Sequence, residues 1–448
     1  MNSTYTADLE KSFTHVVTAL VAELSKGELL TLNLSAEQSH FIRFNNSKVR
    51  QSGIVSDALL GLQLFHNQRT ATLAFQFSGN ANEDIAVGKT HLEQLRAEVA
   101  QLPEDPNIVL PHYTEKSHVV AKGTLLEFAT AAQNLLHSAE GVDFTGLYAS
   151  GPVVRAVANS AGQFHWFASD SFFVDFSLWH KSGKAVKSGF AGTHWNQAQY
   201  EAEIAFARAN LSDLDLPVVE LPAGEYRAYL APAAVSEVLG MFNWNGISES
   251  SIRQKESALV QLRERHVQFS PLFSLSENYA SGLVPRFSES GDLAPELLSL
   301  IEKGELKNTL IHARTAKEYS LEGNGANTDE ALRSPEIAPG NLTQEQILKQ
   351  LGTGVYLSNL HYLNWSDALK GRITGMTRYS CFYVEKGKVK GHLKDMRFDD
   401  SLFSILGKNL EAVTDFQKVM PNTGTYEKRS LGAEKVPGML VSGFKFTL

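Results

Sequence analysis

The sequence predicts an α+β fold with two domains. An N-terminal antiparallel sheet-and-helix domain is expected at residues 1–216, and a C-terminal mixed α/β sheet domain at residues 217–448. Helix patterns followed by strand patterns occur twice in the first part, which indicates two similar halves. Two prolines and a loss of periodicity at about 216–223 mark the boundary. The length of 448 residues, with 43% apolar content, allows a core in each domain.

The first half of the N-terminal domain begins with an amphipathic helix. Apolar residues recur at helical spacing over residues 4–26, and Gly27 ends the pattern. Short runs typical of strands follow between residues 28 and 77, separated by Asn, Gly and Ser turns, and predict an antiparallel meander. Further helices are expected at about 83–101 and 124–138.

The second half repeats this order. Five more strand-like runs lie between residues 145 and 193, the first few joined by Gly, Pro and Asn-Ser turns. A helix is expected at about 197–211, just before the predicted boundary. The C-terminal domain then opens with a strand that enters a short apolar helix at about 230–242, in which Pro232 can occupy the first turn.

The rest of the C-terminal domain mixes short elements with long loops. Charges between residues 249 and 266 are interpreted as a solvated helix or loop face. A strand, a helix that contains Ala316 and Tyr319, and a long Gly/Asn/Pro loop at about 322–341 follow, and loops of that length are often functional. Beyond them the sequence predicts a short helix at 343–351, a hairpin around a Lys-Gly turn, a helix at about 400–412 and a terminal strand.

Composition narrows the functional classes. The net charge is −8, and no basic stripe with interleaved aromatics is present, which argues against direct nucleic-acid binding. The apolar runs are shorter than the roughly 20 residues that cross a bilayer, and the first residues lack the basic head of a signal peptide. The single cysteine, Cys381, fits a reducing compartment and a structural strand position. We therefore expect a cytoplasmic protein that does not enter a membrane.

The common catalytic motifs are missing. HExxH, HExxxH, CxxC, GxSxG and the Walker phosphate loop do not occur, and the histidines are scattered singly. Residues 230–242 would suit a metallopeptidase helix, but no pair of histidines with an adjacent glutamate lies there. The motifs therefore give no catalytic residue.

Several longer segments, in order along nearly the whole chain, carry a family resemblance. They are SDALLGLQLFHNQRTATLAF, PEDPNIVLP and the region up to HWFASDSFFVDFSL in the first half, then GELKNTLIHARTAKEYSLEGNGAN, QILKQLGTGVYLSNLHYLNW and GRITGMTRYSCFYVEKGKVKGHLKDMRFDDSLFSIL in the second. The sequence resembles the TldD/PmbA family, also called modulators of DNA gyrase or TldD–TldE peptidases. No single motif is diagnostic of the family, but the series of segments in this order is specific.

The resemblance also implies a degenerate metal site. In the family's active subunit, HExxxH and a C-terminal cysteine bind zinc, and the glutamate is the general base. Here Gly240, Met241 and Asn245 correspond to the HExxxH positions, and Thr423 to the cysteine. Gly and Met offer no ligand suited to such a site, and one Asn cannot hold zinc. The chain is therefore most similar to the TldE/PmbA-like branch, and no metal, cofactor or catalytic residue is expected.

The resemblance implies a non-catalytic subunit that forms a heterodimer with a TldD-like zinc peptidase and helps to enclose unfolded peptides. The expected peptide-facing residues are Gly352, Gly354, Asn364 and Arg372, near strands that could pair with an extended backbone. Ordinary turn and packing roles for these four residues remain open. Two alternatives are a stand-alone homodimer that binds peptides or regulates a gyrase-related system, and an enzyme with an unrecognised nucleophile.

Overall fold

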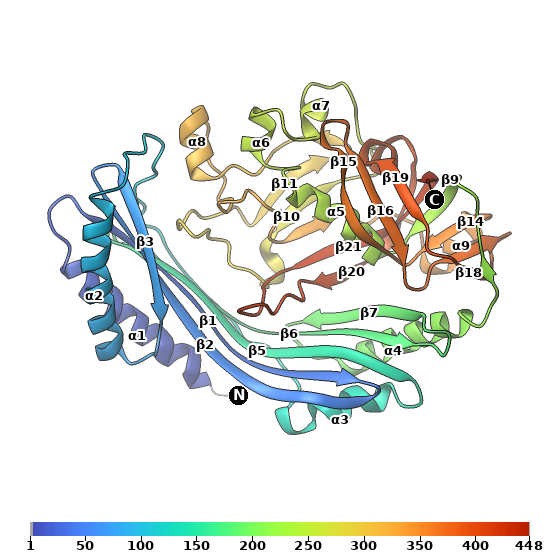
Figure 1. The fold of residues 1–448 in the computed structure, drawn as a ribbon, viewed down its shortest axis with the longest axis horizontal. Coiled ribbons are helices and arrows are strands. Elements are labelled where there is room, and N and C mark those ends of the chain that lie inside the picture. Colours follow the sequence, from blue (N-terminus) through green and yellow to red (C-terminus); the bar gives the residue numbers. More distant parts are fainter. Residues whose placement is uncertain (1–2, 448) are drawn as a thin grey trace.

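The computed structural model describes residues 3–447, which form two sheets that face each other (Figure 1). The first sheet has seven strands in the order β3-β2-β1-β5-β6-β4, with β7 also paired to β6. All its pairs are antiparallel except that of β4 with β6. The strands are β1 (Leu29–Asn45), β2 (Lys48–His66), β3 (Arg69–Gln76), β4 (Lys116–Ala121), β5 (Asp143–Asn159), β6 (Phe164–Trp179) and β7 (Ala185–Gly192).

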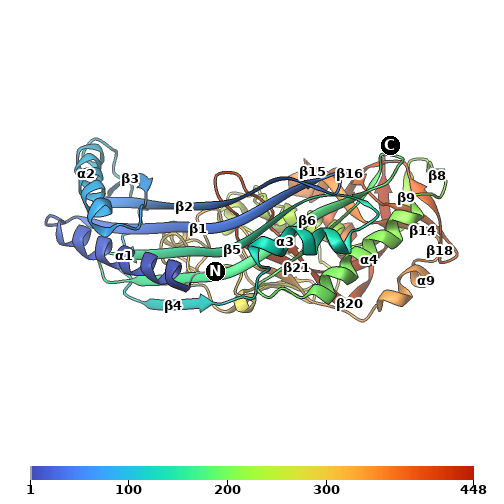
Figure 2. The ribbon, with the colours of Figure 1, turned by 90° about the horizontal axis from the view of Figure 1, so that it is seen from below.

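Four helices cover the convex face of this sheet, away from the second sheet (Figures 1 and 2). They are α1 (Ser3–Ala22), α2 (Ala81–Val99), α3 (Phe128–Ser138) and α4 (Gln197–Asp213). The first two pack on one end of the sheet around Phe13 and Trp166, and the last two pack on the other end around Tyr200 and Phe176. The concave face is therefore left to the rest of the chain.

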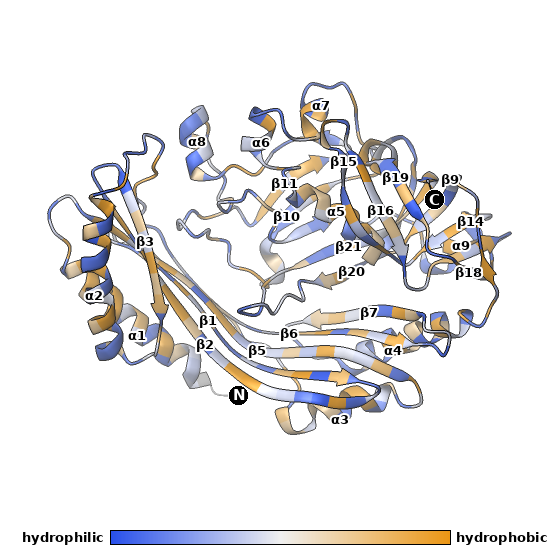
Figure 3. Cartoon of the chain, in the orientation of Figure 1, coloured by the Kyte–Doolittle hydropathy of each residue, from blue (hydrophilic) through white to orange (hydrophobic). Residues whose placement is uncertain are grey.

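The expected two similar halves are confirmed. Helix α1, strands β1 to β3 and helix α2 are followed by α3, strands β5 to β7 and α4 in the same order. The halves meet where β1 and β5 pair antiparallel, with Glu37 opposite Val153. Polar and apolar residues are interspersed along these strands (Figure 3) because one face packs on helices and the other faces inward. Strand β4 was not predicted.

The second sheet is mixed and has 14 strands. Its main path runs β12-β11-β10-β13-β21-β9-β14-β17-β18-β8, and β15, β16, β19 and β20 are attached beside it. The strands are β8 (Val218–Val219), β9 (Gly224–Leu230), β10 (Leu275–Asn278), β11 (Leu297–Glu302), β12 (Glu305–Leu306), β13 (Pro335–Ile337), β14 (Gly354–Leu357), β15 (Asn359–Asp367), β16 (Arg372–Arg378), β17 (Phe382–Glu385), β18 (Lys388–Leu393), β19 (Arg397–Ser401), β20 (Leu410–Pro421) and β21 (Ala433–Phe446).

Five short α-helices accompany this sheet: α5 (Pro232–Gly240), α6 (Glu249–Arg253), α7 (Leu259–Arg263), α8 (Ala313–Tyr319) and α9 (Ile347–Leu351). Helix α5 follows β9 with Pro232 in its first turn, as predicted. Its buried side chains, which include Val235 and Leu239, join the main core of this half. Within residues 3–447, no helix combines the length and apolar character needed to cross a membrane.

Two sequence predictions for the C-terminal half are wrong. The helix expected at 400–412 is only a five-residue π turn, Ser404–Lys408, because Gly407 leaves helical geometry and β20 starts at Leu410 to pair with β21. The charged stretch at 249–266 is not simply a solvated face, since Glu249 is 2% exposed and binds two arginines. Buried ion pairs of this kind cannot be distinguished from surface charges by composition alone.

Candidate interdomain groove

A groove of about 670 Å³ separates the concave face of the first sheet from the second half of the chain. Its lining comes from β1, β2 and β5 on one side. On the other side lie α5, the turn after it, and the segments at 284–289, 332–335 and 420–434. The volume falls within the range of about 300–1,000 Å³ that is typical of ligand sites. The groove is therefore the strongest candidate site between the two sheets.

The sheet wall follows from strand periodicity. Ser35 of β1 lies opposite Leu59 of β2 and Arg155 of β5, so these side chains share one face. Their even-numbered neighbours, such as Leu32 and Leu60, pack under the helices with 0% exposure. Because side chains alternate along a strand, the side chains that do not pack against the helices lie on the opposite face. They form a mixed polar and apolar wall of the groove.

Arg155 supplies positive charge to this wall. Its Nη1 donates to the carbonyl oxygen of Val154 at 2.8 Å, and burial lowers the pKa of its guanidinium to about 10. Lys428, from the opposite side, has its pKa lowered by burial and then by the Arg155 charge. Since both groups lose hydration in the groove and repel each other, an anionic or carbonyl-rich ligand would relieve both effects.

The wall from the second half centres on helix α5. Ser236 points from this helix to Glu434 at the start of β21, and its Oγ donates to Glu434 Oε2 at 2.5 Å. Burial raises the pKa of Glu434 to about 7, the Ser236 hydroxyl lowers it, and the nearby Glu237 carboxylate raises it. The buried Glu434 carboxyl is therefore protonated more readily than an exposed glutamate.

A loop between β20 and β21 ties the two sheets together beside the groove. The backbone N–H of Arg429 donates to Glu37 Oε1 at 2.8 Å. Its guanidinium donates to the carbonyl oxygens of Gly151 at 2.7 Å and Ser171 at 2.9 Å. Arg429 is 4% exposed, so these bonds are made in a site with little water. Charge-assisted hydrogen bonds in such a setting fix the relative position of the two halves.

The four degenerate metal positions lie near the groove but are not among its lining residues. Gly240 ends α5, Met241 is 2% exposed in the core, and Asn245 is exposed with φ 63°. Thr423 lies in the loop after β20. None of these four described residues lines the groove, whereas Ser236 and other residues near them do.

The residues at these four positions do not fit a zinc site. Across residues 3–447, no three His, Cys, Asp or Glu side chains are gathered closely enough to hold a metal ion. The side chains at the four positions supply no thiolate or imidazole. No chemical step through a metal follows from these residues.

The residues expected to face a peptide occupy structural positions outside the groove. Gly352 has φ 66° and ends α9, and Gly354 opens β14, where an added Cβ would lie 2.2 Å from the carbonyl oxygen of Arg227. Asn364, an exposed residue of β15, accepts from the N–H of Trp365 at 2.8 Å. Arg372 pairs with Asp399 at 2.6 Å.

The sequence interpretation missed Ser236, Glu434 and Arg155. A lone serine and glutamate in an otherwise apolar helix was the available signal for Ser236. Glu434 and Arg155 gave no such signal, because they reach the groove only through the packing of distant strands. Long-range placement of this kind is not encoded in local spacing.

Two facing sheets with a groove between them, walled in part by a short helix that contains no His or Cys, define a two-part α+β protein. The chain belongs to the PmbA/TldD family, because the family model for the PmbA/TldA metallopeptidase C-terminal domain matches residues 223–448, about half of it. Among curated proteins, none matches the sequence significantly.

Solved structures of similar fold agree with this assignment. TldE from Thermococcus kodakarensis has a TM-score of 0.79 at 15% identity, over 98% of this chain and 100% of that one. A candidate modulator of a DNA gyrase from Thermotoga maritima has a TM-score of 0.76 at 15% identity with the same coverage. A similarly named protein from Bacteroides thetaiotaomicron has a TM-score of 0.76 at 15% identity, over 98% of each chain. At this identity the likeness establishes the fold.

Proposed function

We propose that this chain is a metal-free, non-catalytic TldE/PmbA-like subunit that pairs with a TldD-like zinc peptidase and holds unfolded peptides for cleavage. The observation that carries the proposal is a groove in a metallopeptidase-family fold whose helix α5 and following turn contain no His or Cys. Catalysis would then depend on the partner subunit, and this chain would contribute binding surface.

The groove lining supports a peptide ligand. Apolar side chains such as Leu59, Phe287 and Met420 can cover side chains of varied sequence. Arg155 and Lys428 can donate hydrogen bonds to the backbone carbonyl oxygens of a peptide or to its acidic side chains. This combination suits an extended chain better than a small rigid molecule, because the contacts are spread along the groove.

We place the protein in the cytoplasm. Its one cysteine, Cys381, is a buried free thiol that donates to backbone carbonyls, which is compatible with a reducing compartment. Proteolysis of unfolded peptides there would require the TldD-like partner to meet this chain in the same compartment.

A second candidate function is a homodimeric peptide-binding or regulatory protein of the gyrase-modulator type. It is supported by the likeness to structures that carry that name. The two functions differ in whether a zinc-bearing partner is needed, which makes them separable by experiment.

The test compares the purified chain alone with the chain mixed with a TldD-like zinc subunit. Metal content, co-elution in size-exclusion chromatography and cleavage of casein would be measured in each sample. We expect no zinc and no cleavage alone, with co-elution and cleavage in the mixture. Stoichiometric zinc or robust cleavage by the chain alone would contradict the proposal, and a homodimer that ignores the zinc subunit would favour the second function.

A further inference from the structure

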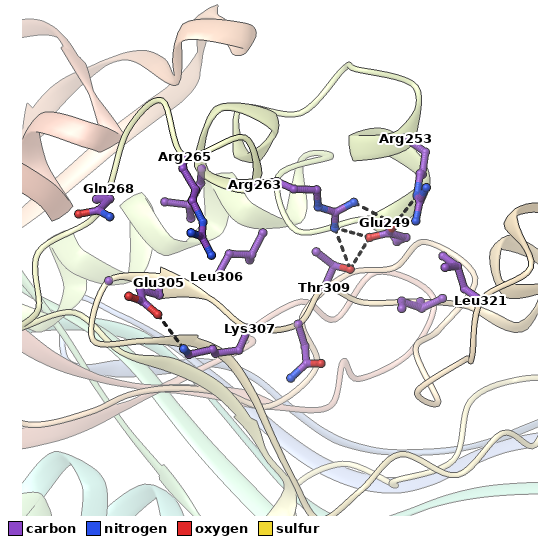
Figure 4. A pocket seen from close by; sticks show the side chains of 14 residues that line it. Glu249, Arg253, Arg263, Arg265, Gln268, Glu305, Leu306, Lys307, Thr309 and Leu321 are labelled. Carbon is purple, nitrogen blue, oxygen red and sulfur yellow. Dashed lines mark hydrogen bonds and ion pairs between the residues drawn. The ribbon is translucent and has the colours of Figure 1, made fainter.

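A second cavity lies in the C-terminal half and shares no lining residue with the interdomain groove. Its volume is about 490 Å³, and it is bounded by α6, α7, β12 and the segment that leads toward α8 (Figure 4). Six charged side chains line it: Glu249, Arg253, Arg263, Arg265, Glu305 and Lys307. Its chemistry is therefore set by how these charges pair.

Glu249 is already saturated by its neighbours. Arg253 Nε donates to its Oε1 at 2.7 Å, Arg263 Nη1 donates to the same oxygen at 3.0 Å, and Thr309 Oγ1 donates to Oε2 at 2.6 Å. Although burial favours its neutral form, the hydrogen bonds from Arg263, Thr309 and Arg253 lower its pKa to about 2. This carboxylate is ionised near neutral pH and has little capacity for a further cation.

The cations outnumber the carboxylates. Lys307 and Glu305 form their own pair at 2.8 Å, so they neutralise each other. The three arginines then face a single carboxylate, Glu249, which leaves two positive charges in the cavity. Excess charge of one sign in a concave site attracts the opposite sign more strongly than on a flat surface.

Arg265 is the arginine without a partner. Within residues 3–447, its guanidinium takes part in no ion pair, and in Figure 4 the side chain points into the cavity toward Leu306 and Lys307. Its backbone has φ 59°, a left-handed conformation that non-glycine residues seldom adopt. Arg265 therefore presents a planar set of five donors to the cavity, a geometry that matches phosphate and carboxylate oxygens.

We propose that this cavity binds an oxyanion, a phosphate or carboxylate group, through Arg265 with support from the free N–H groups of Arg253 and Arg263. The arginines held by Glu249 are fixed in place before the ligand arrives, because two short helices position them around one buried carboxylate. The ligand then completes the charge balance that the protein leaves open. This site shares no lining residue with the interdomain groove.

The test is isothermal titration of the full chain at low salt with inorganic phosphate and, separately, with acetate. Arg265→Asn removes the guanidinium while keeping a residue that tolerates the left-handed conformation, so folding is expected to persist. Arg50→Asn, at an exposed position on β2, is the matched control for the loss of one positive charge. Arg265→Lys keeps the charge and loses the planar fork.

We expect saturable binding by the natural chain, about tenfold or greater weakening in Arg265→Asn and intermediate weakening in Arg265→Lys, since hydrogen bonds to charged groups have that strength. The control should bind as the natural chain does. Tighter binding of phosphate identifies a phosphate site, and tighter binding of acetate identifies a carboxylate site. Absence of saturable binding by both anions, or equal affinity in Arg265→Asn, would overturn the proposal.

Discussion

The two sheets differ in the length of their strands. Strands β1, β2, β5 and β6 of the first sheet have 17, 19, 17 and 16 residues. Of the described strands in the second sheet, only β20 and β21, with 12 and 14 residues, exceed ten. Long strands repeat their alternation many times and so specify register strongly, whereas short strands depend on contacts from elsewhere in the chain. The first sheet therefore acts as a regular support, and the second half supplies most of the irregular segments that form the sites.

The largest expected effect tests whether the two regions fold as one unit. Phe13 in the first sheet's core and Phe242 in the second are 0% and 1% exposed. Changing either to alanine should lower the free energy of unfolding by about 3–5 kcal/mol, because a large buried ring leaves a cavity. Urea unfolding followed by circular dichroism should show one transition in both variants, since Arg429 joins the sheets. Two transitions, each shifted by only one of the variants, would contradict this.

The buried charge cluster in the second half should be nearly as sensitive. Glu249→Gln leaves Arg253 and Arg263 without their carboxylate and should cost about 3 kcal/mol at neutral pH. In the natural chain, the pKa of Glu249 is lowered to about 2 in the folded state, so its contribution is present above its unfolded pKa and is lost as pH falls from about 4.5 toward 2. Chemical denaturation at several pH values checks both points. Glu256→Gln, at an exposed neighbouring position, is the control and should change little.

Glu434 should have the opposite pH dependence. Its pKa is raised to about 7 in the folded state, so the protonated form favours folding and stability falls as pH rises from about 4.5 through 7. Glu434→Gln should remove this decrease and stabilise the protein by about 1–2 kcal/mol at pH 8. Thermal unfolding of both proteins across this pH range is the measurement. An unchanged pH profile in the variant would show that Glu434 is not the responsible group.

The smallest expected effect concerns a helix cap in the first domain. The Asn80 side chain accepts from the N–H of Asn82 at 3.2 Å at the start of α2. Asn80→Ala should lower the free energy of unfolding by about 1 kcal/mol, because the N–H of Asn82 at the helix start loses its acceptor. Asn82→Ala is the control, since that side chain does not cap the helix. If both variants unfold at the same urea concentration, the cap contributes nothing.

Local sequence patterns predicted most of the helices and strands of the first domain. The strands up to residue 77 and the first helix follow from periodicity that the structure keeps, although the helix predicted over residues 4–26 spans Ser3–Ala22 and Gly27, with φ 88°, lies in the turn before β1. The family and the α+β class were also accessible from the order of sequence segments.

The residues of the candidate sites were much harder to predict from the sequence. Leu402, Ile405 and Leu406 are buried at helical spacing, yet a non-helical Gly407 limits them to one turn. Glu249 looked like one charge among many until two arginines 4 and 14 residues later were seen around it. Such contacts depend on how helices and strands pack in three dimensions, and the spacing of residues in a single sequence does not show that packing.

The way in which Arg429 joins the two sheets determines which substitutions the protein can tolerate during evolution. Its guanidinium binds main-chain carbonyls of Gly151 and Ser171, so replacing the side chain at Ser171 leaves the acceptor in place. Gly151 is different, because it has φ 139° and an added Cβ would lie 2.1 Å from the carbonyl oxygen of Gln38. Position 171 of β6 can therefore accept other residues without loss of this hydrogen bond, whereas position 151 of β5 requires glycine.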